Sequence, residues 1–274
     1  MKKTKKLRVG IVGCGAIGSR IAKSISQELK SDCALSALFD IDTEKSKKLS
    51  AKFSAKNLIK KNLSDLIRSC DLVVEAVTST ETQKIVSDVL RAKKHVLAMS
   101  VGKLLYADKL FALARKNKCA LLLPSGAIAG LDAIKAASLR NISSVVLTTR
   151  KPPVGFANSA YIIKKNIDLN AIACETVLFD GHVDDAVHWF PKNINVAATL
   201  AIASNCKEKV RVRILTSPEF KLNSHEIEVI GDFGRMVSRT DNVVCPDNPK
   251  TSYLAVLSAI QTLKQFFNTV KIGT

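Results

Sequence analysis

Three glycines near the start of the chain, Gly13, Gly15 and Gly18, have the spacing of a turn that binds phosphate groups. An apolar segment precedes them, and a helical pattern of apolar residues follows. In such a strand–turn–helix unit the first glycine permits the bend, the second lets a pyrophosphate approach the backbone, and the third lets the helix pack on the strand. The first N–H groups of the helix, at Ala16 and Ile17, then face the phosphates. The spacing therefore predicts a dinucleotide-binding turn.

A second apolar segment, residues 34–39, ends in Asp40. This acid follows the turn at ~20 residues, where dinucleotide folds place the carboxylate that binds the adenosine ribose. Such an acid favours NAD over NADP. Lysines at 45, 47 and 48 lie near enough in the sequence that a 2′-phosphate could be tolerated. The expected cofactor is therefore NAD or NADP.

Apolar strands and helical patterns continue to alternate as far as Pro124. This alternation predicts an α/β fold with a Rossmann-type, doubly wound parallel sheet, whose ligand lies at the carboxyl ends of the strands. Ala76, Val77 and the loop 100–102 should then border the nicotinamide half of the site. Strands are expected at 71–77, 95–99 and 119–123, and helices at 41–53 (capped by Asp42 or Thr43), 63–69, 78–90 and 106–117.

The pattern changes after Pro124, because the later strands alternate between apolar and polar residues, as in a sheet with one wet face. We expect these strands at 143–149, 177–179, 210–214 and 225–229, and a turn between two strands at 232–234. A final helical stripe runs to Phe267, with Pro249 in its first turn. The sequence thus predicts a dinucleotide-binding domain of residues 1–124 plus 246–274, to which the C-terminal helix returns, and an α+β substrate domain of residues 125–245.

The composition is typical of a globular protein, with 274 residues, 47% of them hydrophobic and 24% charged. The net charge of +18 comes from scattered lysine pairs, without a recognisable nucleic-acid module. It indicates a solvated lysine-rich surface or the focusing of an anionic substrate toward a cleft. The seven cysteines form no CxxC pair, and no apolar run approaches the ~18 residues of a membrane span. We expect a cytoplasmic protein with no metal, nucleic-acid or membrane partner.

Three segments together resemble the L-aspartate dehydrogenase family: residues 124–132 (PSGAIAGLD), residues 190–198 (FPKNINVAA), and His225-Glu226-Ile227 followed by Gly231. Residues 148–153 (TTRKPP) also look like that family's second-domain strand. The resemblance runs through essentially the whole chain in the expected order. The FPKNINVAA-type segment is far more specific than the glycine turn.

The resemblance implies NAD(P)-dependent oxidation of L-aspartate to iminoaspartate, which water converts to oxaloacetate and ammonia, and which feeds NAD biosynthesis in many organisms. It also implies that His225 is catalytic and that Ala127 and Asn195 touch the dinucleotide. We separately expect the protein to be a homo-oligomer, specifically a homodimer. Two other interpretations remain open. One is a related two-domain reductase of another small acid, such as dihydrodipicolinate. The other is a dinucleotide sensor without catalytic activity.

Hydride transfer needs a group that removes a proton from the amine or from an attacking water, and an imidazole suits this role near neutral pH. Strand alternation places His225 on the same face as Ile227 and Val229, so its ring should point inward. Asn193 and Asn195 lie in the first turn of an apolar helix, where an amide either caps the helix or meets a ligand. We expect Asn193 and Lys192 at the substrate. Further candidates for binding its carboxylates are Arg150, Lys151 and the helix start after Gly130.

Overall fold

The computed structural model of the chain describes residues 6–53, 57–77, 80–157, 159–190, 194–246 and 248–273. Contacts divide the chain into two compact units. Unit 1 comprises Met1–Pro124 and Val256–Lys271, and unit 2 comprises Ser125–Ala255 and Ile272–Thr274.

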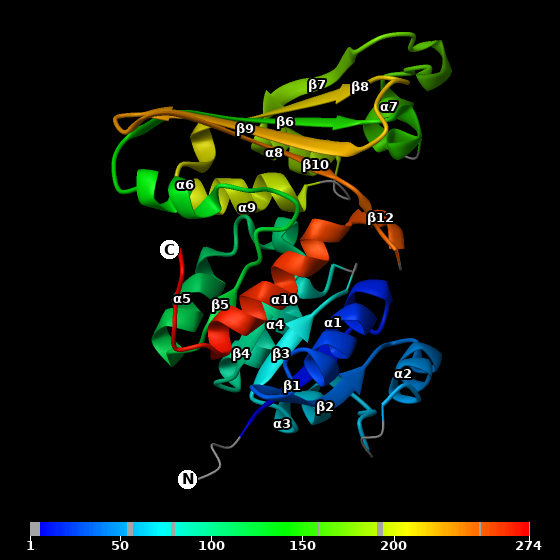
Figure 1. Cartoon of the computed structure of the whole chain (residues 1–274), viewed down its shortest axis with the longest axis vertical. Helices are drawn as coiled ribbons and strands as arrows, with labels where there is room; N and C mark the ends of the chain where they lie inside the picture. Colours follow the sequence, from blue (N-terminus) through cyan, green and yellow to red (C-terminus); the bar gives the residue numbers. More distant parts are fainter. Residues whose placement is uncertain are drawn as a thin grey trace. The chain divides into compact units, whose positions relative to one another are not determined.

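Unit 1 is built on a parallel sheet in the order β2-β1-β3-β4-β5 (Figure 1). The strands are β1 (Leu7–Val12), β2 (Cys33–Phe39), β3 (Leu72–Glu75), β4 (His95–Ala98) and β5 (Leu121–Leu122). All four residues of β3 are buried, as expected for a strand covered on both faces. The predicted Rossmann-type sheet is therefore confirmed.

The helices of unit 1 connect or cover these strands. Asp42 forms the cap predicted for the helix that starts at Thr43, because its side chain accepts a hydrogen bond from the Glu44 N–H at 3.1 Å. The ring of Phe266, in the C-terminal helix, lies 5.1 Å from the ring of His95, so the predicted return of that helix to the first unit is confirmed. These helices are α1 (Ala16–Gln27), α2 (Thr43–Ser50), α3 (Leu63–Arg68), α4 (Thr82–Arg91), the short 3₁₀ turn η1 (Val101–Leu104), α5 (Asp108–Asn117) and α10 (Tyr253–Phe267).

One expectation at the end of the chain is wrong. Pro249 does not lie in the first turn of the last helix, because α10 begins at Tyr253. Pro249 belongs instead to β12 (Asn248–Ser252), which pairs antiparallel with β11 (Val244–Cys245) in a two-stranded ribbon. Each strand of such a ribbon has a free edge, where a residue without an N–H group can be accommodated.

Unit 2 contains a mixed sheet in the order β10-β9-β6-β8-β7, in which β6 and β8 run parallel and the other neighbours run antiparallel. Gly231 pairs with Gly234 where β9 turns into β10, so the predicted turn at 232–234 is confirmed. The strands are β6 (Ile142–Lys151), β7 (Thr176–His182), β8 (Val210–Thr216), β9 (Asn223–Gly231) and β10 (Gly234–Asn242).

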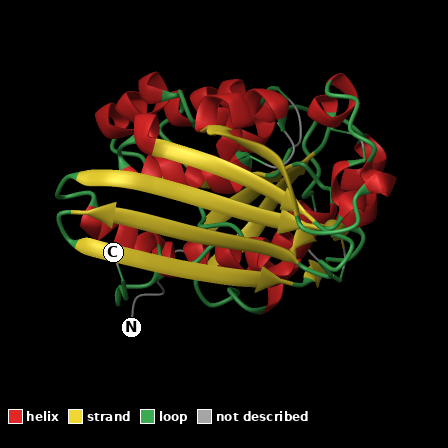
Figure 2. Cartoon of the chain, turned by 90° about the horizontal axis from the view of Figure 1, so that it is seen from above, coloured by secondary structure: helices red, strands yellow, loops and turns green. Residues whose placement is uncertain are grey.

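The two faces of this sheet differ. The face that carries Leu147, Ile227 and Val229 is buried, and Figure 1 shows α6, α8 and α9 on that side; we call it the covered face. Figure 2 looks onto the opposite, outer face, which carries charged residues such as Glu226 and Glu228. The helices of unit 2 are α6 (Leu131–Ala137), α7 (Ala160–Lys164), α8 (Val183–Trp189) and α9 (Asn195–Ser204), with short 3₁₀ turns η2 (Pro153–Phe156), η3 (Leu169–Ala171) and η4 (Lys207–Lys209).

Candidate functional site

The glycine turn of unit 1 contains two glycines that the fold itself requires. Gly13 has a φ of +94°, and a Cβ atom there would lie 2.4 Å from the carbonyl oxygen of Ala76. A Cβ atom at Gly18 would lie 1.9 Å from the carbonyl oxygen of Gly13. These contacts hold the start of α1 against β1 and the end of β3, and any larger residue would separate them.

Gly15 differs from both neighbours because a Cβ atom there would meet nothing within 4 Å. It is exposed, and its extended backbone directly precedes α1. Ala16 and Ile17 lie in the first turn of α1, which contains no acidic residue that would repel an anion or compete with it for the N–H groups. Open space in front of unsatisfied N–H groups is the arrangement that a pyrophosphate requires. The turn therefore fits a dinucleotide.

Asp40 is tied to this turn by hydrogen bonds. Its Oδ2 accepts from the Cys14 N–H at 2.7 Å, and its Oδ1 accepts from the Asp42 N–H at 2.9 Å. Each carboxylate oxygen can accept a second hydrogen bond. The carboxyl group is thus held beside the glycine turn with acceptor capacity left for ribose hydroxyls.

Glu75 is a fully buried acid at the carboxyl end of β3, directly before Ala76 and Val77. Its Oε1 accepts from the hydroxyls of Thr82 and Ser100, each at 3.0 Å, and from the Val77 N–H at 3.3 Å, while its Oε2 accepts from the Ser100 N–H at 3.2 Å. Burial raises the pKa of this carboxyl group, against the lowering effect of these donors. Glu75 thus joins the loop after β3 to the loop after β4.

Sequence reasoning missed Glu75, although a charged residue ending an otherwise apolar strand was a visible signal. In the sheet Val12 pairs with both Phe39 and Glu75, and Glu75 pairs with Ala98. The glycine turn, Asp40, Ala76 and Val77 therefore follow neighbouring strand ends at one edge of the sheet. This edge is where open α/β sheets bind their ligands.

In unit 2, His225 lies on the covered face of β9 and is 4% exposed, as its alternation with Ile227 and Val229 predicts. Thr149 stands directly opposite on β6, and its Oγ1 is 3.0 Å from Nδ1 of His225. Burial and the positive charge of Lys151 lower the pKa of His225 to about 3. The ring is therefore neutral at physiological pH, with one nitrogen engaged and Nε2 left for another partner.

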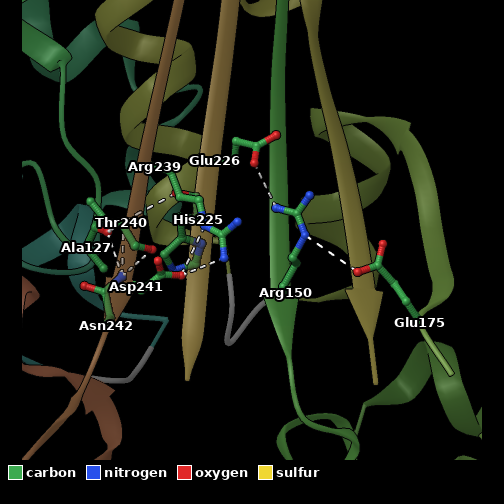
Figure 3. A network of polar contacts seen from close by, with 9 residues as sticks. All are labelled: Ala127, Arg150, Glu175, His225, Glu226, Arg239, Thr240, Asp241 and Asn242. Carbon is green, nitrogen blue, oxygen red and sulfur yellow. Dashed lines mark hydrogen bonds and ion pairs between the residues drawn. The ribbon is translucent and has the colours of Figure 1, made fainter. Parts of the chain in front are cut away.

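The carbonyl group of Ala127 is hydrogen-bonded to the strand that neighbours His225. Thr240, which pairs with His225, donates its hydroxyl to the Ala127 oxygen at 2.7 Å, and Asn242 donates to the same oxygen at 3.1 Å (Figure 3). Ser238 bonds the Ala129 oxygen in the same way at 3.0 Å. Polar side chains of β10 thus hold the loop at residues 125–130 next to His225.

Arg150 does not share the face of His225. It follows Thr149 on β6, and successive side chains of a strand point to opposite faces. Figure 3 shows Arg150 between Glu226 and Glu175, at 3.2 Å and 4.0 Å. Arg150 is therefore an ion-pair residue of the outer face, and the structure does not bring this candidate for carboxylate binding together with His225.

The FPKNINVAA-type segment is described only in part. Lys192 and Asn193 lie outside the described residues. Asn195 begins α9 and is exposed, and its carbonyl oxygen accepts from the Thr199 hydroxyl at 2.8 Å.

Among the residues that the structure describes, no helix is both long and apolar enough to cross a membrane.

Comparison with known proteins agrees with this architecture. Residues 13–124 match the model for the NAD-binding domain of homoserine dehydrogenase, and residues 132–266 match the model for the C-terminal domain of aspartate dehydrogenase. A crystal structure of aspartate dehydrogenase from Thermotoga maritima superimposes with a TM-score of 0.75 at 22% identity, covering 98% of this chain and 100% of that one. At that identity the likeness shows the fold.

Curated sequences carry the assignment further. The chain is 43% identical to the L-aspartate dehydrogenase of Methanosarcina mazei, covering 98% of this chain and all of the relative. It is 39% identical to the L-aspartate dehydrogenase of Methanothermobacter thermautotrophicus, covering 98% of this chain and 99% of that relative. With an NAD-binding domain, the second-domain match and full-length identity of about 40%, the chain belongs to the L-aspartate dehydrogenase family of oxidoreductases.

Proposed function

We propose that this protein oxidises L-aspartate to iminoaspartate with NAD or NADP, and that water then converts the product to oxaloacetate and ammonia. The observation that carries the proposal is the buried, neutral His225 on the covered face of unit 2, in a chain that belongs to this family. When bound, the nicotinamide dinucleotide accepts the hydride that leaves the α-carbon. Iminoaspartate released by the reaction can supply NAD biosynthesis.

The residues of unit 1 would bind the dinucleotide. Gly15 leaves room for the pyrophosphate, and the N–H groups at the start of α1, from Ala16 and Ile17, donate to it. Asp40 accepts from the ribose hydroxyls. Ala76 and Val77 line the nicotinamide end, where Glu75 keeps their loop attached to the loop after β4. Unit 1 is thus proposed as the dinucleotide domain, divided from the substrate domain near residues 124 and 245.

The residues of unit 2 would handle the proton. Nε2 of His225 can accept a proton only if the ring hydrogen resides on Nδ1, and Nδ1–H then donates to Oγ1 of Thr149 at 3.0 Å. Thr149 is therefore a positioning residue that sets the tautomer. His225 takes a proton from the substrate amine, or from the water that attacks the imine. Ala127 and Asn195 are proposed to contact the dinucleotide, and Lys192 and Asn193 the substrate.

The test is turnover of L-aspartate with NAD and with NADP, followed through the absorbance of the reduced coenzyme, and of oxaloacetate plus ammonia in reverse. L-Asparagine and D-aspartate serve as alternative substrates with oxidised coenzyme, and dihydrodipicolinate, which a reductase would reduce, is assayed with NADH or NADPH. The proposal predicts turnover of L-aspartate above all three. Absence of turnover in both directions with both coenzymes would overturn it, and preference for dihydrodipicolinate would indicate the related reductase instead.

Two finer expectations accompany this function. We propose that the enzyme is a homodimer, which light scattering on the purified protein would test by its mass. We also propose a cytoplasmic location, as the reduced state expected of its scattered cysteines suggests.

A further inference from the structure

Lys151 shares the covered face of the unit 2 sheet with His225. On β6, Val145, Leu147 and Thr149 are buried on that face, and Lys151 is the next side chain in the same alternation. Thr149 pairs with His225, and Lys151 is the residue two positions further along β6, on the same face as the imidazole. On the other side Lys151 pairs with the fully buried Thr216, whose hydroxyl donates to the Lys151 carbonyl at 2.8 Å.

The ammonium group of Lys151 interacts with His225 electrostatically. Burial lowers the pKa of Lys151 to about 8, and its positive charge contributes to the low pKa of His225. A buried ammonium group is costly for the fold, because it gives up hydration. Such a cost beside a candidate catalytic ring indicates a functional role.

The neighbouring acids of the sheet are engaged on the other face. Glu226 follows His225 and pairs with Arg150 at 3.2 Å, and Asp241 pairs with Arg239 at 3.1 Å. Alternation directs these four side chains away from the covered face. On the covered face, Lys151 places a positive charge on the same side of the sheet as His225, and this charge is complementary to an anionic group of a substrate.

We propose that the ammonium group of Lys151 binds a carboxylate of the dicarboxylate substrate, beside His225 on the covered face of the unit 2 sheet. This inference rests on the proposed function and adds a substrate-binding residue to it. A carboxylate at Lys151 would also offset the field that the ammonium group exerts on the imidazole. Binding of the anion would then raise the pKa of His225, so that the ring becomes a better base once the substrate is in place.

Other charged groups near His225 could also link its pKa to the binding of an anion, so their positions matter. Lys151 is on the same face, and Arg150, Glu226, Arg239 and Asp241 are on the outer face of the adjoining strands. The loop at residues 125–130 and helix α9 carry no titratable side chain. The outer-face pairs lie on the opposite side of the sheet from Lys151, so we attribute a change in the behaviour of His225 in a Lys151 variant to the loss of Lys151 itself.

The test compares wild type, Lys151→Met, Lys151→Arg and the matched control Lys165→Met, an exposed lysine just after α7. Succinate, a dicarboxylate that cannot be oxidised at an amine, serves as the binding probe in calorimetry. We expect Lys151→Met to weaken succinate binding and to raise the KM for L-aspartate by about 10- to 100-fold, the range of a charge-assisted hydrogen bond. Lys151→Arg should recover part of this loss, and Lys165→Met should match wild type.

A second readout separates binding from a merely structural role. In Lys151→Met the acid limb of the kcat/KM profile should move to higher pH, because His225 loses a neighbouring positive charge. In wild type, succinate affinity should fall as the pH rises above about 8, where Lys151 loses its proton. This measurement needs no variant, so it decides the matter even if Lys151→Met does not fold.

The outcomes are distinguishable. If wild type oxidises L-aspartate while Lys151→Met keeps its KM and its succinate affinity within about twofold, the role of Lys151 is overturned and the proposed function stands. A succinate affinity that stays constant in wild type up to about pH 10 would likewise overturn the role of Lys151. If wild type binds succinate through Lys151 but oxidises no aspartate, the anion site stands and the proposed function is overturned.

Discussion

Replacement of His225 by asparagine should make the stability of the protein less sensitive to acid. In the folded protein the pKa of His225 is lowered to about 3, first by burial and then by Lys151, whereas the ring in an unfolded chain titrates at about 6.5. Between these values the unfolded state binds more protons than the folded state. Stability is therefore fully present above pH 6.5 and declines as the pH falls toward 3.

The size of the effect follows from the width of this window. Each pH unit below 6.5 costs about 1.36 kcal/mol, so at about pH 4.5 the neutral ring destabilises the wild-type fold by about 2.7 kcal/mol relative to pH 7.5. Asparagine removes this titration, and its side chain can still meet the hydroxyl of Thr149. Carboxylates elsewhere titrate equally in both proteins, so the difference between them isolates His225.

The assay is urea unfolding of wild type and His225→Asn at several pH values between 7.5 and 4.5. The difference in the free energy of unfolding should change by about 2.7 kcal/mol in favour of the variant as the pH falls. Parallel loss of stability in the two proteins would show that the imidazole is not buried in a neutral form. The proton-accepting role proposed for it would then lose its physical basis.

Three further outcomes follow from the two units. Gly15→Ala should keep wild-type stability but raise the Kd for NAD, whereas Gly18→Ala should lower the free energy of unfolding by about 3 kcal/mol or more, because only the latter overlaps backbone; chemical denaturation and NAD titration measure both. Asp40→Asn should lower kcat/KM for NAD by about tenfold and leave NADP less affected, since a charged ribose acceptor is lost; equal effects on both coenzymes would contradict this assignment. Thr149→Val should lower kcat/KM for L-aspartate by about tenfold, while Thr149→Ser should remain near wild type because it keeps the oxygen that accepts from His225; equal losses would refute the tautomer role.

The local features of the fold could be predicted from the sequence because they depend on neighbouring residues. The spacing of Gly13 and Gly18 reflects contacts within one strand–turn–helix unit, and the inward direction of His225 follows from simple alternation along β9. The same alternation along β6 could have separated Lys151 from Arg150, since Leu147 and Thr149 mark the covered face.

Features that depend on register or on distant loops could not be predicted in this way. Thr149 meets His225 across 76 positions of sequence, and only the pairing of β6 with β9 brings them together. Glu75 finds its partner Ser100 in a loop 25 positions away. The sequence alone misplaces Pro249 because proline suits both a first helical turn and an edge strand, and tertiary pairing decides between them.

The most direct test of the central claim follows the hydrogen on the α-carbon of the substrate. L-Aspartate carrying deuterium at that carbon is incubated with the enzyme and NAD, or with NADP, and the reduced coenzyme is analysed by mass spectrometry. The proposed reaction predicts that one deuterium per turnover appears in the reduced coenzyme, and that His225→Asn slows its appearance by about 10²- to 10⁴-fold. Reduced coenzyme without deuterium, or labelling at an undiminished rate in His225→Asn, would contradict it.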